Sequence, residues 1–190
     1  MPEGPEVDTD ALRETIEEPP SGRLLRNIAM TTALFAALGA VAALRAGATV
    51  NEALVLKTEA GRSQAEASDQ WAYYQAKGIK AGVQEALRTT WLAASKTPPP
   101  EIEKTIKRYE GEQKEIEKAA REKEGERDKM SREADQLLEK HHGFANSVAL
   151  IQVSIALGAV AALTRIRLVW AGSLGLGLIG AGMFLVTLIR

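Results

Sequence analysis

The sequence predicts an all-α protein with three transmembrane helices and a long antiparallel helical hairpin, resembling a coiled coil, outside the membrane. Three runs contain no Asp, Glu, Lys or Arg: 28–44, 144–163 and 168–189. As helices they would reach about 26, 30 and 33 Å, close to the bilayer hydrocarbon thickness of about 30 Å. Between the first two runs the chain is densely charged but keeps helical apolar spacing.

The composition argues against several classes of function. A net charge of -1 offers no basic face for nucleic acid. The chain has no cysteine, which removes disulfides, thiolate nucleophiles and Cys-based zinc sites. No catalytic or nucleotide-binding motif stands out, so we expect a non-enzymatic protein without a cofactor or a metal, whose first partner is the lipid bilayer.

The N-terminal part divides into a tail, a span and the first arm of the hairpin. Residues 1–22 are acidic and contain several prolines, which is typical of a flexible tail. We expect the first transmembrane helix over 23–44, continuing into water. Gly61 weakens that helix, and Ser63-Gln64-Ala65-Glu66 has the form of a capping box, which predicts a kink or restart. From there to Lys96 the pattern is helical again, with one side formed by Ala72, Ala76, Ile79, Val83, Ala86 and Thr90.

Consecutive prolines mark the corner of the hairpin at 97–100, because proline removes a backbone donor and excludes helical geometry in the residue before it. The hairpin as a whole spans 45–143, and the second and third transmembrane helices follow at 144–163 and 168–189. The second arm has a thin seam that falters at Lys123 and Arg127, so we expect lateral partners for the hairpin. The seam comprises Ile102, Ile106, Tyr109, Gln113, Ile116, Ala120, Met130, Ala134 and Leu137.

Small residues form stripes along the predicted spans. Such stripes let helix backbones approach closely, which is how helices associate in lipid. Gln152 lies within the second stripe, where we expect it to hydrogen-bond a neighbour, and lining a pore is the alternative. The stripes comprise Ala29, Ala33, Ala36, Ala40, Ala43 and Gly47, then Ala145, Ala149, Gln152, Ala156 and Ala159, then Ser173, Gly177 and Ala181.

These features together favour a self-associating membrane scaffold, a homo-oligomer held by the stripes and by the hairpin. Two alternatives use the same surfaces. One is an accessory subunit of a larger membrane complex, and the other is an oligomeric pore. The segments carry no ionisable residue, so proton-coupled or ion-coupled transport lacks its usual groups.

Adjacent His141 and His142 are candidates for a zinc site or a protonation switch. Neighbouring histidines point in different directions on a helix, and no third ligand has suitable spacing. An interfacial or capping role is therefore favoured, without metal.

Arginines indicate the orientation in the membrane. Arg165 and Arg167 lie in a short loop, where the positive-inside bias acts most strongly. Together with Arg23 and Arg26 they predict a cytoplasmic N-terminus and a periplasmic hairpin, although basic residues beside the hairpin favour the reverse.

The most distinctive string of the chain is its one aromatic cluster, Trp71-Ala72-Tyr73-Tyr74-Gln75-Ala76-Lys77. Its aromatic side chains lie on several helix faces, so we expect Trp71, Tyr73, Tyr74, Gln75 and Lys77 to form an interaction surface, with packing inside the hairpin as the alternative. With Asn51-Glu52-Ala53-Leu54 and Ala67-Ser68-Asp69-Gln70, the string resembles an uncharacterised family of bacterial three-span membrane proteins, a domain of unknown function. The resemblance implies a bacterial inner-membrane protein and brings with it no known activity, ligand or catalytic residue. Gly78 and Gly82, which depart from the family, are expected to loosen the helix.

Overall fold

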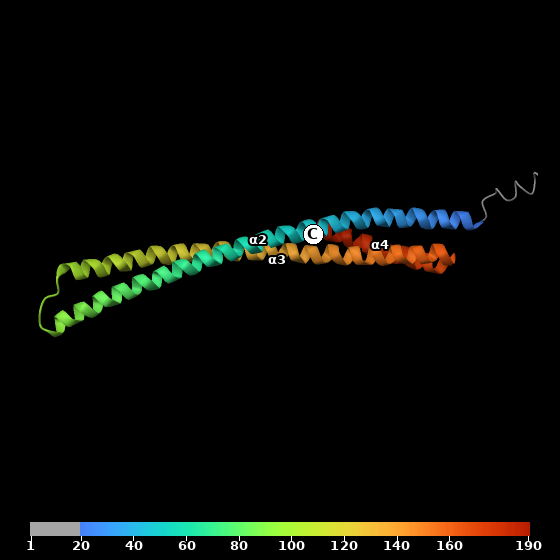
Figure 1. Ribbon diagram of the computed structural model, residues 1–190. Coiled ribbons are helices and arrows are strands. Elements are labelled where there is room, and N and C mark those ends of the chain that lie inside the picture. Colours follow the sequence, from blue (N-terminus) through green and yellow to red (C-terminus); the bar gives the residue numbers. More distant parts are fainter. Residues whose placement is uncertain (1–19) are drawn as a thin grey trace, which may run out of the picture. The chain divides into compact units, whose positions relative to one another are not determined.

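The computed structural model describes residues 20–190, which form three helices: α2 (Pro20–Ala93), α3 (Pro100–Thr164) and α4 (Arg167–Ile189) (Figure 1). The described residues contain no strand, so the predicted all-α class is confirmed. Each helix contains a segment long and apolar enough to cross a membrane. These residues form two compact units, one of 20–50 with 138–190 and the other of 51–137. The predicted acidic tail lies outside the described residues, apart from 20–22.

The unit of 51–137 is a helical hairpin. The second half of α2 runs antiparallel to the first half of α3, and residues 94–99 connect them (Figure 1). Glu101 and Glu103 lie in the first turn of α3 behind Pro100, where acidic groups stabilise the positive end of the helix dipole. The two predicted long helices do pack together.

Alternating steps of four and three residues bring one face of each arm against the other, as in a coiled coil. On α2 this face is rich in alanine, with Ala53, Ala60 and Ala67 buried at intervals of seven residues. On α3 it includes buried Ile102, Ile106, Ile116, Ala120 and Ala134. The sequence-predicted seam of α3 is therefore the face that packs.

The predicted restart near Gly61 is wrong, because α2 is continuous from Pro20 to Ala93. Gly61 lies on the exposed face, and its cost of about 1 kcal/mol relative to alanine is small beside the packing on either side. Ser63 is 3% exposed, so this residue is part of the packed face and is not a helix cap.

The apolar side that the sequence shows on the first arm does not face α3. Ile79 and Val83 are 69% and 61% exposed, and Ala72, Ala76, Ala86 and Thr90 are exposed as well. Their positions are displaced by two residues from the packed face, which is about 200° around a helix. We call these six residues the outer face of α2.

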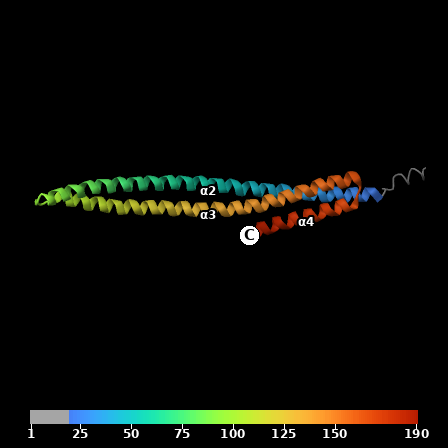
Figure 2. The ribbon, with the colours of Figure 1, turned by 90° about the horizontal axis from the view of Figure 1, so that it is seen from below.

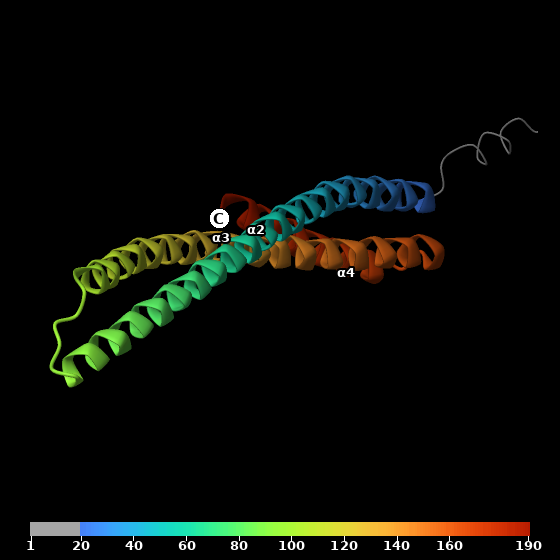
Figure 3. The same ribbon diagram turned by 60° about the vertical axis from the view of Figure 1, so that its left-hand side comes forward.

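The unit of 20–50 and 138–190 contains three helical segments. α4 folds back beside the last part of α3 after a turn of two residues (Figures 2 and 3). In this turn Arg165 adopts a positive φ of 57°, and its N–H donates to the carbonyl of Ala161 at 2.8 Å. Ala42, Ala46, Phe144 and Phe184 form the core cluster.

Candidate interaction surfaces

The aromatic motif divides between the inside and the outside of the hairpin. Trp71 Nε1 donates a hydrogen bond to Glu124 of α3 at 3.0 Å, and the ring of Tyr74 meets the ring of Trp71 edge-on at 5.5 Å. The guanidinium of Arg121 lies 5.7 Å from the Trp71 ring. Trp71 and Tyr74 are half-buried and directed at α3, so much of this aromatic surface packs within the chain.

Lys77 is the charged member of the motif that lies inside the hairpin. Its ammonium group contacts Glu112 at 2.5 Å, and its side chain is 13% exposed. It lies 5.0 Å from the Tyr73 ring and 5.5 Å from the Tyr109 ring, both within cation–π range. The hydrogen bond from Lys77 lowers the pKa of Glu112, and the same bond, followed by one to Tyr73, raises the pKa of Lys77.

Tyr73 and Gln75 remain on the outside. Tyr73 is 51% exposed and Gln75 is exposed, beside Ala72 and Ala76 of the outer face. The face therefore combines an aromatic edge with apolar side chains at coiled-coil spacing. This part of the motif is open to another protein.

α2 is continuous through Gly78 and Gly82, so the predicted loosening does not break the helix. The Gln113 amide of α3 donates to the carbonyl of Tyr74 at 3.3 Å. A Cβ at Gly78 would lie 2.8 Å from that amide nitrogen. The absence of a side chain at Gly78 therefore lets Gln113 reach the backbone of α2. A Cβ built at Gly82, in contrast, would have no atom within 4 Å.

The places where the predicted seam falters carry ion pairs in the structure. Lys123 lies between Glu66 of α2 at 3.1 Å and Glu126 of its own helix at 2.9 Å, and these contacts raise the pKa of Lys123, with Glu126 the larger cause. Arg127 donates to Gln64 across the hairpin. Long basic side chains therefore continue the packing where apolar ones are missing.

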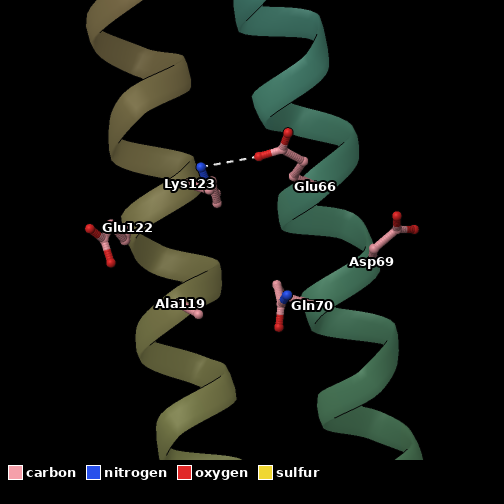
Figure 4. Close-up of a pocket in the computed structure, with 6 residues that line it drawn as sticks. All are labelled: Glu66, Asp69, Gln70, Ala119, Glu122 and Lys123. Carbon is pink, nitrogen blue, oxygen red and sulfur yellow. Dashed lines mark ion pairs between the residues drawn. The ribbon is translucent and has the colours of Figure 1, made fainter.

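A small cavity of about 300 Å³ beside Lys123 is lined by Glu66, Asp69 and Gln70 of α2 and by Ala119 and Glu122 of α3 (Figure 4). Its carboxylates do not converge, because Asp69 and Glu122 point away from each other. Among the described residues no group of three acidic, His or Cys side chains could hold a metal ion.

Two serines join α3 and α4. Ser154 Oγ donates to the carbonyl of Ser173 at 2.8 Å, and Ser173 Oγ donates to the carbonyl of Ser154 at 2.7 Å. Both residues are buried, at 0% and 3% exposure. Sequence reasoning placed Ser173 in a packing stripe but missed Ser154.

Glycines allow α4 to approach the other two helices. A Cβ at Gly177 would lie 2.3 to 2.7 Å from three ring atoms of Phe35 in α2. A Cβ at Gly180 would lie 3.2 Å from the backbone nitrogen of Ile151 in α3. Ser173, Gly177, Gly180 and Phe184 are buried and Ala181 is half-buried, so they form the face of α4 that packs within the chain.

The predicted stripes of α2 and α3 lie on the outside of this unit. Each is displaced by one residue, about 100°, from the buried face of its helix. Gln152 is exposed and forms no hydrogen bond within the described part of the chain, so the expected bond to a neighbour is not made inside one copy. The exposed members are Ala29, Ala33, Ala36, Ala40, Ala43, Ala149, Gln152, Ala156 and Ala159, and Gly47 and Ala145 are half-buried.

Residues from both stripes meet along one groove. Ala29, Ala33 and Ala36 of α2 and Ala159 of α3 line the same apolar groove of about 390 Å³. α4 occupies the other side of this helix pair, where it contacts Leu150 and Ser154 of α3. The α2–α3 pair therefore has one side covered within the chain and one side, which we call the stripe face, uncovered.

His141 has a structural contact. Its Nδ1 lies 2.9 Å from the carbonyl oxygen of Ala46 in α2, and its ring lies 5.6 Å from that of His142. This contact with Ala46 joins α3 to α2.

The fold and these surfaces define a helical membrane-protein class: three helices able to cross a bilayer, two of which extend into a hairpin. Residues 24–190 match the family described as domain of unknown function DUF4337, and the chain belongs to that family. No curated protein and no solved structure matches the chain.

Proposed function

We propose that the protein is a non-enzymatic membrane scaffold of the bacterial inner membrane, which self-associates through the stripe face and through the outer face of α2. The observation that carries the proposal is the one-sided packing of the α2–α3 pair. α4 covers one side, and the exposed side bears small residues at heptad spacing on both helices. In lipid, close approach of backbones drives helix association, and such a surface suits it.

The hairpin supplies the second contact. Ile79 and Val83 are among its most exposed apolar residues, and the outer face contains no charged side chain. Copies inserted in the same direction would present their outer faces in parallel. Like residues then meet like residues without repulsion, because alanine, isoleucine, valine and threonine all tolerate such pairing.

The arginines support a cytoplasmic N-terminus with the hairpin in the periplasm. Arg165 lies in the two-residue connection between α3 and α4 and Arg167 begins α4, and short connections follow the positive-inside bias. Attaching a reporter that is active on one side of the membrane to either terminus tests this orientation.

Gentle detergent extraction followed by mass measurement tests the assembly. We expect a single homo-oligomeric species, and Ala36→Leu with Ala40→Leu should weaken it because the added bulk holds backbones apart. Ala171→Leu, at an exposed position of α4 away from the stripe face, is the matched control.

Two outcomes would overturn the scaffold. A foreign protein bound in fixed proportion would identify an accessory subunit of a larger complex. Conductance in liposomes that disappears in Gln152→Leu would identify a pore. An unchanged oligomer mass in the double variant would exclude the stripe face as the contact.

A further inference from the structure

His142 continues the small-residue stripe of α3 toward the hairpin. It lies three residues before Ala145, and His142, Ala149 and Ala156 follow one another at intervals of seven residues, so they share one side of the helix. His142 is exposed, as Ala149 and Ala156 are, and it lies just before the second charge-free run. It is therefore an ionisable side chain at the end of a stripe that is otherwise without charge.

The other histidine of the chain, His141, is engaged inside the unit of 20–50 and 138–190. Its Nδ1 lies 2.9 Å from the carbonyl oxygen of Ala46. A carbonyl oxygen can only accept a hydrogen bond, so this nitrogen carries a proton and donates, whether the ring is neutral or charged. The contact holds α3 against α2 in both protonation states. Of the two histidines, His142 is thus the one whose surroundings change when a second copy covers the stripe face.

The charged side chains around this exposed histidine come from all three helices. On α2 they are Arg45, one residue before the contact just described, and Glu52 of the hairpin unit. On α3 they are Glu139 and Lys140, and on α4 it is Arg190. Glu139 pairs with Arg190 at 3.9 Å, so the one acidic residue among the described residues of this unit already has a basic partner. A positive charge gained here would join Arg45 and Lys140 without a further carboxylate of the unit to balance it.

We infer that His142 is a protonation switch for self-association: the stripe faces of two copies join while its ring is neutral and separate when it is protonated. The inference rests on the contact between stripe faces proposed above. Copies inserted in the same direction bring their His142 rings to the same depth, at the hairpin end of that contact. Histidine is the side chain whose charge ordinarily changes between pH 5 and 8. Charged rings at one interface repel each other and lose their hydration, so protonation favours separate copies.

The oligomer mass of the full-length protein in gentle detergent, measured over a range of protein concentrations at about pH 8 and about pH 5.5, tests the switch. Carboxylates ordinarily stay ionised over this range, so it separates histidine from them. Each proton that the contact excludes weakens association by up to about tenfold per pH unit. We expect an oligomer at about pH 8 and a dissociation constant larger by about tenfold or more at about pH 5.5. Circular dichroism at both pH values shows that the helices are kept.

Variants at the two histidines assign the effect. His142→Gln and His142→Ala are neutral at both pH values and should keep the oligomer at the lower one, and alanine also matches the other small residues of the stripe. His142→Lys is charged at both pH values and should weaken association at the higher one as well. His141→Gln is the matched control: its amide can still donate to Ala46, and it should keep the pH dependence because His142 remains.

A failure of the switch can be told apart from a failure of the scaffold. An oligomer mass that is the same at both pH values would overturn the switch and leave the scaffold intact, whereas a monomer at both would overturn the two together. A pH dependence that persists in both neutral His142 variants would assign it to other groups and overturn the switch. Dissociation at about pH 8 on adding EDTA would show instead that the histidines of two copies hold a metal ion, because a metal binds deprotonated histidine.

Discussion

Gly177 of α4 lies directly against the ring of Phe35 of α2, so closely that a methyl group at 177 would be 2.3 Å from the nearest ring atom. Phe35 is 9% exposed and has little space to move. This contact sets how near the third helix can lie to the first, and it links the small-residue pattern of the last span to a specific partner.

We predict that Gly177→Ala destabilises this unit by about 1–3 kcal/mol, the usual cost of overpacking. Gly182→Ala is the control, because a Cβ at Gly182 meets no atom within 4 Å and the residue is exposed on the same helix. The thermal unfolding midpoint in detergent compares the two variants. Equal midpoints would show that α4 does not pack on Phe35.

The reciprocal serine pair makes a second prediction for the same unit. Ser154→Ala and Ser173→Ala each remove one of the two hydrogen bonds to a backbone carbonyl, and such bonds within membrane helices contribute about 0.6 kcal/mol on average. Because the two hydroxyls lie 3.5 Å apart, the double variant should cost less than the sum of the single ones. A double-mutant cycle on unfolding in detergent measures this coupling, and strict additivity would contradict it.

Patterns of charge and large apolar residues made the class of fold predictable. The three charge-free runs lie within the three helices, and Pro100 starts α3. The α3 seam was visible because Ile102, Ile106 and Ile116 are conspicuous among charged neighbours. Extending that seam by steps of three and four reaches Phe144, Val148 and Ile151, which are buried or half-buried in the other unit.

The packed face of α2 could not be predicted in the same way, because its residues are less apolar than those on its outside. Ala60, Ser63 and Ala67 pack against α3, whereas Ile79 and Val83 are exposed. By hydropathy the outer face of α2 would be chosen as the packed one. The hairpin instead packs through small side chains, because these let the two helix backbones approach closely.

Alanine substitutions at the two glycines after the aromatic motif should differ in their effect on the stability of the hairpin. Gly82→Ala should stabilise the hairpin by about 0.5–1 kcal/mol, because alanine favours helix and meets open space. Gly78→Ala gains the same propensity but displaces the Gln113 amide from Tyr74, at a cost of about 0.5–1.5 kcal/mol. Hydrogen exchange of the hairpin amides in the full chain measures both. A gain at Gly78 as large as at Gly82 would show that Gln113 does not hold this position.

The contact of Lys77 with Glu112 predicts a dependence on pH. The lowered pKa of Glu112 means that its ionised form stabilises the fold above the ordinary carboxyl pKa of about 4.3, and that this stabilisation disappears as the pH falls through the lower folded value. The raised pKa of Lys77 places the corresponding loss at the alkaline end, above about 10.4. Glu112→Gln should therefore make the free energy of unfolding of the hairpin less dependent on pH in the acid range. Glu110→Gln, exposed two residues away, should leave the profile unchanged.

The end of α2 offers a stabilising change. Ser95 has a φ of 56°, its N–H donates to Leu92 at 2.9 Å, and the N–H of Lys96 donates to Trp91 at 3.0 Å. This is the Schellman arrangement, in which the residue of positive φ is most often glycine because a side chain is strained there. Ser95→Gly should raise the free energy of unfolding of the hairpin by up to about 1 kcal/mol, the strain relief exceeding the added entropy of the unfolded chain. Ala94→Gly, one residue earlier, adds the entropy without relieving strain and should give no gain. If hydrogen exchange in the full chain slows equally in both variants, or in neither, the left-handed conformation of Ser95 does not limit the stability of this end of the hairpin.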